Sequence, residues 1–120
     1  MFKAYDQEQM LLLPPALSDL VPEDHLARVV NDVVNEIDIG VIVRTYSSLG
    51  QDAYDPRMML KVLFYGYATG IRSARKLAKR LREDVIFMWL AGMQAPDFRT
   101  LALFRQSRLS GIKEIFTGIV

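Results

Sequence analysis

The stretch from Asp55 to Asp84 constrains the fold most. It joins a segment that is apolar nearly all round to a segment with apolar residues on one side and charged residues on the other. Asp55 can accept the free backbone amides that begin a helix, and Pro56 suits the first turn, where its missing N–H costs nothing. The residues that follow leave few positions for water: Arg57, Lys61 and Thr69. Neighbouring helices normally bury a helix of this composition, so we predict a central core helix here.

The second segment starts at a turn of residues 70–73 and is a basic amphipathic helix. Gly66, just before the turn, favours close approach of a neighbouring backbone to the central helix. Ser73 can cap the second helix. Its apolar residues recur at helical spacing along one side: Ala74, Leu77, Ala78 and Leu81. Its cations fall on the other side: Arg75, Lys76, Lys79, Arg80 and Arg82.

Charge is distributed unevenly along the chain. Residues 1–55 hold ten acids and three bases, whereas residues 56–120 hold twelve bases and four acids. Because no acid lies between Arg57 and Arg82, we expect the basic helix to lack the i to i+4 partners that neutralise a solvated helix face. This asymmetry favours a basic surface that meets nucleic acid or an anionic membrane.

Length and composition indicate one domain spanning residues 1–120, since 51% of the residues are hydrophobic and one core suffices for this size. The absence of cysteine excludes disulfides and thiolate metal sites. There is no signal peptide and no apolar run of membrane-spanning length, so we expect a soluble, cytoplasmic chain without membrane contact.

The N-terminal part is predicted to be an arm, residues 1–13, followed by one helical turn over residues 16–20 and a helix that starts near Pro22. The stripe predicted to face the core contains Leu26, Val29, Val30, Val33, Val34 and Ile37. The residues predicted to face out are Arg28, Asn31, Asp32, Asn35 and Glu36.

Residues 38–50 are ambiguous, because their β-branched side chains favour a strand by propensity. Nothing else in the chain alternates in the way a partner strand would, so we favour a short helix from Val41 to Ser48. Residues 47–55 read as a surface loop.

The C-terminal third is predicted to be helical. Asp84 can cap a short apolar helix, residues 85–90, which carries the core residue Trp89 and ends at Gly92. Asp97 can cap a further helix whose core positions are Leu101, Phe104 and Leu109. A last apolar stripe, residues 112–119, reaches the end of the chain without a stop signal, which suggests a fragment of a longer protein or an oligomer interface.

Catalysis and metal binding are not predicted. The single histidine, His25, has no second histidine or cysteine to complete a ligand set, so we expect a capping or solvated role. The acid pairs, such as Glu83 with Asp84, are explained by loops and caps. The segment from Gly66 to Gly70 lacks the lysine and the preceding strand of a phosphate-binding loop. We therefore expect a non-enzymatic domain without cofactors.

The basic helix has two interpretations, a solvated face and a nucleic-acid face. The lack of acids favours the nucleic-acid face. The order of elements, a helix, a turn that contains glycine and a second helix, also follows the helix-turn-helix layout. Arginine suits guanine edges and lysine suits phosphates, so Arg75 and Arg80 are candidate base contacts. The candidate backbone contacts are Lys76, Lys79 and Arg82, beside Arg72 and Ser73 of the turn. A second candidate surface contains Arg99, Arg105 and Arg108.

The order of short motifs resembles the N-terminal domain of bacterial insertion-sequence transposases of the DDE group. The matching blocks include residues 22–25, 55–61, 65–67, 70–75, 89–92, 96–100 and 104–105. The resemblance implies a helical module that binds the element's terminal inverted repeats in double-stranded DNA. It also implies a nucleoid-associated protein whose catalytic ribonuclease H-like domain, absent from this chain, carries three acids and two divalent metals. Residues 106–111 depart from the family's more basic pattern.

An alternative function is assembly. In this hypothesis the domain forms a homodimer or docks the catalytic domain of the full-length transposase, with the acidic half of one copy meeting the basic half of another. The two hypotheses separate on one feature. DNA binding requires that the cations between Arg72 and Arg82 project outward, unmatched by carboxylates from the N-terminal half.

Overall fold

A computed structural model describes residues 2–5, 7, 17–44, 53–108, 111 and 113, and the described chain is helical, as predicted. The only β feature among these residues is an isolated parallel bridge between Phe2 and Ala53. The predictions for residues 8–16 and 45–52, for the core position Leu109 and for the apolar stripe at residues 112, 115, 116 and 119 lie outside the described residues. The helices are η1 (Leu17–Leu20), α1 (Leu26–Glu36), α2 (Gly40–Val43), α3 (Pro56–Ala68), α4 (Ala74–Glu83), α5 (Val85–Leu90) and α6 (Phe98–Ser107).

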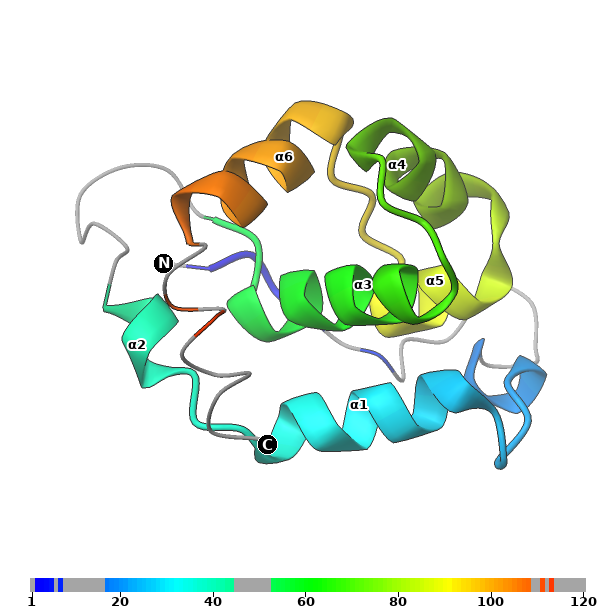
Figure 1. Cartoon of the computed structure of the whole chain (residues 1–120). Coiled ribbons are helices and arrows are strands. Elements are labelled where there is room, and N and C mark those ends of the chain that lie inside the picture. The colour runs from blue at the N-terminus through cyan, green and yellow to red at the C-terminus, as the bar shows by residue number, and fades with distance from the viewer. Residues whose placement is uncertain are drawn as a thin grey trace.

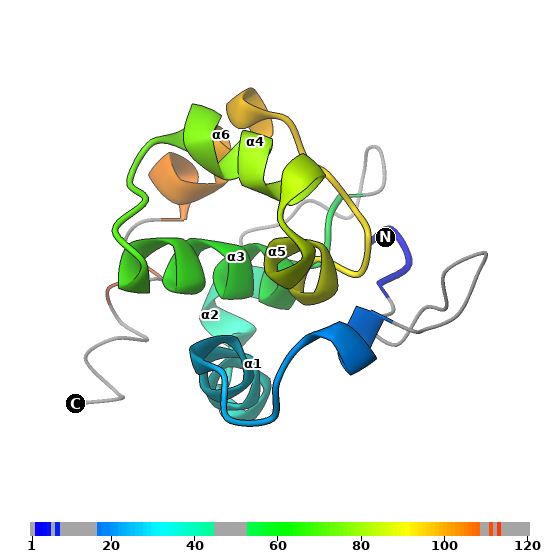
Figure 2. The same cartoon turned by 90° about the vertical axis from the view of Figure 1, so that its right-hand side faces the viewer.

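The helices form three layers around α3. In Figures 1 and 2, α4 and α6 lie side by side on one side of α3 and α5, and α1 lies on the other. The N-cap of α3 is as predicted, because the Asp55 carboxylate accepts the backbone N–H groups of Arg57 and Met58 at 2.8 and 3.3 Å. The side chains of Met58, Leu60 and Val62 are fully buried. The central core helix predicted from the sequence is therefore confirmed.

The prediction for the polar positions of α3 was wrong at Lys61, which is 1% exposed. Its ammonium donates to the Tyr5 hydroxyl at 3.0 Å and to Gln7 Oε1 at 2.9 Å, so the N-terminal segment supplies the acceptors that water would otherwise provide. Burial lowers the pKa of Lys61 to about 8. Water reaches the end of α3 instead, where Tyr67 and Ala68 are exposed.

Gly66 leaves room for the Leu77 side chain of α4, whereas the sequence predicted the close approach of a neighbouring backbone. A Cβ placed there would lie 2.5 Å from Leu77 Cδ2. The Gly66 carbonyl also accepts the Ile71 N–H at 2.7 Å, which closes the turn between the two helices. Gly70 in this turn has φ +84°, a conformation that glycine adopts without strain.

Helix α1 differs from its prediction in where it starts and in which face it buries. It begins at Leu26, and His25 rather than a residue near Pro22 caps it, with Nδ1 accepting the Ala27 N–H at 3.0 Å. The prediction that Leu26, Val29 and Val33 face the core was wrong, because all three are exposed. The buried residues of α1 are Ala27, Asn31 and Val34.

A short helix was predicted from Val41 to Ser48, and the structure has a helix from Gly40 to Val43. Residues 45–48 of the prediction lie outside the described residues.

Asp84 and Asp97 cap α5 and α6 as predicted. Asp84 accepts the Ile86 N–H at 2.8 Å, and Asp97 accepts the Thr100 N–H at 2.9 Å. Trp89 is 1% exposed and is a core residue, as the sequence indicated.

Candidate nucleic-acid interface

The basic face lies on α4, whose local sequence explains how it is presented. Ser73 Oγ accepts the Lys76 N–H at 3.4 Å and begins the helix. Leu77 and Leu81 are 1% and 2% exposed, so the predicted apolar stripe is confirmed as the side that packs on the domain. The opposite side carries exposed cations: Arg75, Lys76, Lys79, Arg80 and Arg82.

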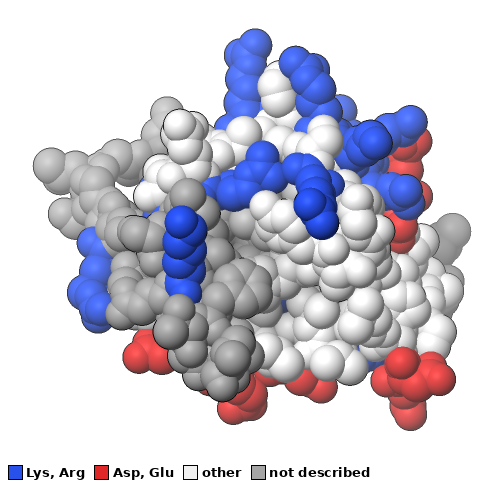
Figure 3. All heavy atoms as spheres, in the orientation of Figure 1, with Lys and Arg blue, Asp and Glu red and all other residues white. Residues whose placement is uncertain are grey.

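Positive and negative side chains gather on opposite sides of the molecule. In Figure 3 most of the basic side chains lie over the layer of α4 and α6, where some acidic side chains lie beside them at the right, and further acidic side chains lie along the lower edge, on the side of α1. This arrangement agrees with the charge asymmetry of the sequence. The α4 side is therefore the one that an anionic partner would approach.

The expectation that α4 lacks i to i+4 partners was wrong for two cations. Lys79 Nζ lies 4.0 Å from a Glu83 carboxylate oxygen, and Arg80 Nη1 lies 3.6 Å from Asp84. Both pairs are long and solvent-exposed, and such pairs contribute about 0.3–0.5 kcal/mol. Within the part of the chain that the structure describes, no carboxylate of the N-terminal half pairs with these cations.

Arg75 is held by an aromatic ring from the neighbouring helix. Its guanidinium carbon lies 3.9 Å from the centroid of the Phe98 ring, and that of Arg99 lies 5.7 Å from the same centroid. A cavity of about 320 Å³ opens here between α4 and α6, and its walls include Arg82. The stacking limits the rotamers of Arg75 and fixes where its charge is presented.

The second predicted surface does not form a single patch. Arg99 is exposed beside α4, but Arg105 is half-buried and its Nη1 donates to the Arg72 backbone carbonyl at 2.9 Å. Arg108 donates to Ser107 Oγ at 2.6 Å, and both residues line a different cavity, together with Lys3 and Tyr54. Arg99 therefore extends the α4 surface, whereas Arg105 joins α6 to the turn that precedes α4.

The structure offers few groups for chemistry among the described residues. No three His, Cys, Asp or Glu side chains gather there in a way that could hold a metal ion. His25 caps α1, the role expected for it, and its ring lies 5.9 Å from that of Tyr65. No described helix has the length and apolar character needed to cross a membrane.

The described residues form an all-α domain whose helix α4 exposes a basic face, and one arginine of that face, Arg75, stacks on the Phe98 ring of α6. The chain belongs to the family described as a transposase domain (DUF772), whose model matches residues 15–107. The resemblance to a domain of transposases is thereby confirmed. No curated protein and no solved structure is significantly similar to the chain.

Proposed function

We propose that this domain is the DNA-recognition module of an insertion-sequence transposase and binds the element's terminal inverted repeats through α4. The observation that carries the proposal is the set of five exposed cations on the outer side of α4. The family match supports a role in transposition. In this proposal no residue of the domain is catalytic, and a separate ribonuclease H-like domain performs strand transfer.

The layout of α3 and α4 supports a helix-turn-helix mode of binding. The two helices are joined by the short turn of residues 69–73, and α4 is the second, solvent-facing helix. In such motifs the N-terminal part of the second helix contacts base edges in the major groove. Arg75 lies on that part of α4 and is oriented by Phe98, so it is our main candidate for base contact.

The remaining cations are assigned by their position on the helix. Arg80, our second candidate for base contact, lies in the last turn of α4 beside Asp84. Lys76, Lys79 and Arg82 are proposed to contact phosphates, since an ammonium or an exposed guanidinium along the helix edge suits the DNA backbone. Arg72, Ser73 and Arg99 border the same surface and would contact neighbouring phosphates.

A salt titration of DNA binding tests this proposal. If α4 neutralises about five phosphates, log K falls against log salt with a slope near −4 to −5. The Lys76→Ala, Lys79→Ala double variant should bind more weakly and flatten the slope by about 2. Gel shifts or fluorescence anisotropy on a duplex with the inverted repeat, and on a scrambled duplex, measure both quantities.

Arg44→Ala is the matched control, because it removes one exposed cation at the end of α2, away from α4. It should leave the slope unchanged. A slope that responds to Arg44 but not to the two lysines would place the DNA surface elsewhere. A chain that binds neither duplex would reject the proposed function.

A further inference from the structure

Helix α1 carries an apolar ridge that the fold leaves uncovered. The ridge contains Leu26, Val29 and Val33, which are 45%, 56% and 41% exposed. They are spaced i, i+3 and i+7, so they lie on one face of the helix. Single exposed apolar residues are ordinary, but adjacent ones on one helix face indicate a surface that meets another molecule.

The ridge is bordered by negative charge. Asp32 and Glu36 are exposed along one edge. The single basic residue of α1, Arg28, is occupied elsewhere, since its Nη2 donates to the backbone carbonyls of Ser18 and Val21 at 2.7 and 2.9 Å. Two α1 ridges packed against each other would bring like charges together, which costs free energy. The charge pattern therefore calls for a basic partner surface.

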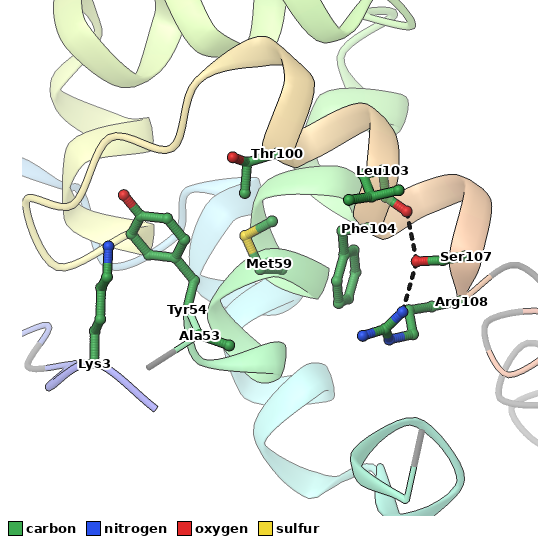
Figure 4. A pocket seen from close by; sticks show the side chains of 9 residues that line it. All are labelled: Lys3, Ala53, Tyr54, Met59, Thr100, Leu103, Phe104, Ser107 and Arg108. Carbon is green, nitrogen blue, oxygen red and sulfur yellow. Dashed lines mark hydrogen bonds between the residues drawn. The ribbon is translucent and has the colours of Figure 1, made fainter. Parts of the chain in front are cut away.

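The same chain presents an apolar pocket with a basic rim. Figure 4 shows this cavity of about 420 Å³, with Tyr54, Met59 and Phe104 among its walls. Leu103 also lines the pocket and is 64% exposed, the highest value among the described large apolar residues. Lys3 supplies the positive rim, with its ammonium 4.2 Å from the centroid of the Tyr54 ring.

The pocket does not compete with the proposed DNA surface. Thr100, Leu103 and Ser107 line it from one side of α6. Phe98 and Arg105 contact residues of α4 and its preceding turn from the opposite side, about 180° around the helix. The ridge likewise lies on α1, beyond α3 from α4. Both surfaces would stay accessible with DNA on α4.

We propose that the α1 ridge of one copy of this chain docks into the Lys3–Leu103 pocket of a second copy. The acid-bordered apolar ridge and the cation-rimmed apolar pocket are complementary in polarity and in charge. Because the two surfaces differ, the contact is heterologous, and it leads to a ring or a chain of copies rather than to a symmetric dimer. This inference does not depend on DNA binding by α4.

Two variants separate the halves of the interface without disturbing the core. The Val29→Gln, Val33→Gln double variant alters only exposed positions of α1, where glutamine is also a better helix former than valine. Leu103→Gln alters the pocket at an exposed position. Tyr67→Gln, at an exposed aromatic residue of α3, is the matched control. Urea denaturation of each variant checks that stability is retained.

Sedimentation velocity and equilibrium give the decisive readout. The wild-type chain and the Tyr67→Gln control should associate with rising concentration, whereas the ridge variant alone and the pocket variant alone should remain monomers. Mixed in equal amounts, the two variants should form dimers and nothing larger, because one brings an intact pocket and the other an intact ridge. High salt should weaken this association.

Three results would overturn the proposal. The wild-type chain could remain monomeric up to about 1 mM, which corresponds to a dissociation constant weaker than about 1 mM. Other proteins would then cover the two surfaces. The single variants could associate as wild type does. The mixture could stay monomeric although wild type associates, which would indicate a symmetric contact between identical surfaces.

Discussion

Helices α1 and α4 are both amphipathic, yet only α4 buries the stripe that its sequence predicts. In α4 the two leucines of the stripe are buried and the cations face water. Helix α1 is rotated by about 100°, the angle between consecutive residues, relative to the orientation that would bury Leu26, Val29 and Val33. An apolar stripe therefore sets the orientation of a helix only when the polar groups of that helix have no hydrogen-bond or ring partner elsewhere in the domain.

Polar contacts explain the orientation of α1. Arg57 of α3 donates to the carbonyls of Val34 and Ile37 at 2.5 and 2.8 Å, which satisfies acceptors at the end of α1. Arg28 lies over the Trp89 ring, 4.5 Å from its centroid. Asn31 accepts a hydrogen bond from Gln7 at 2.7 Å. The contacts of Arg28 and Asn31 require the side of α1 that the hydrophobic pattern assigns to solvent.

The largest expected effect is a difference in unfolding free energy between two alanine variants, one in the apolar stripe of α4 and one in that of α1. Leu77→Ala, in the buried stripe of α4, should cost about 2–5 kcal/mol of unfolding free energy through lost burial and a cavity next to Gly66. Val29→Ala, on the exposed ridge of α1, should change it by less than about 0.5 kcal/mol. Urea denaturation monitored by Trp89 fluorescence measures both. Equal losses would mean that the two faces are buried alike.

Much of the fold could be predicted because its signals are local. Asp55, Ser73, Asp84 and Asp97 cap helices as expected, since the side chain and the amides it accepts are at most three residues apart. The orientation of α1 depends on contacts far apart in the sequence, such as Arg57 with Val34, and a pattern confined to one helix cannot show them.

In the candidate interface, residue spacing predicted which side of α4 is basic. It did not predict the contacts that α6 makes with that side. Phe98 is the first residue of the helix that Asp97 caps, and nothing in the spacing indicates that its ring contacts Arg75 of α4. Arg105 was predicted to face out and is instead bonded to the Arg72 carbonyl. The assignment of these cations to DNA contacts stays a prediction.

A smaller effect is expected from the buried Lys61, whose partner Gln7 also holds Asn31 of α1. Its pKa is lowered by burial to about 8, below that in the unfolded chain, so the unfolded state binds more protons between about pH 8 and pH 10. Stability should therefore rise with pH in this window, by about 1–2 kcal/mol up to pH 9.5. Urea denaturation at successive pH values measures the slope.

Lys61→Met is the control, because it keeps the volume of the side chain and removes the titrating group. This variant should lose the rise between pH 8 and pH 9.5. Tyr5 does not produce the rise, since burial raises the pKa of its hydroxyl and the unfolded state would lose that proton first. A wild-type stability that falls through this window would contradict a charged, buried Lys61.

The smallest expected effect concerns Phe98, which orients the charge that α4 presents. Phe98→Leu keeps an apolar side chain but removes the ring under the Arg75 guanidinium. A cation–π contact at an exposed site is worth about 0.5–1 kcal/mol, so affinity for the inverted-repeat duplex should fall about two- to fivefold. The salt slope should not change, because no cation is removed. Phe98→Tyr keeps an aromatic ring under the guanidinium and should bind the duplex as the wild-type chain does. If the leucine and tyrosine variants bind DNA equally, the ring does not position Arg75, and α4 presents its cations without help from α6.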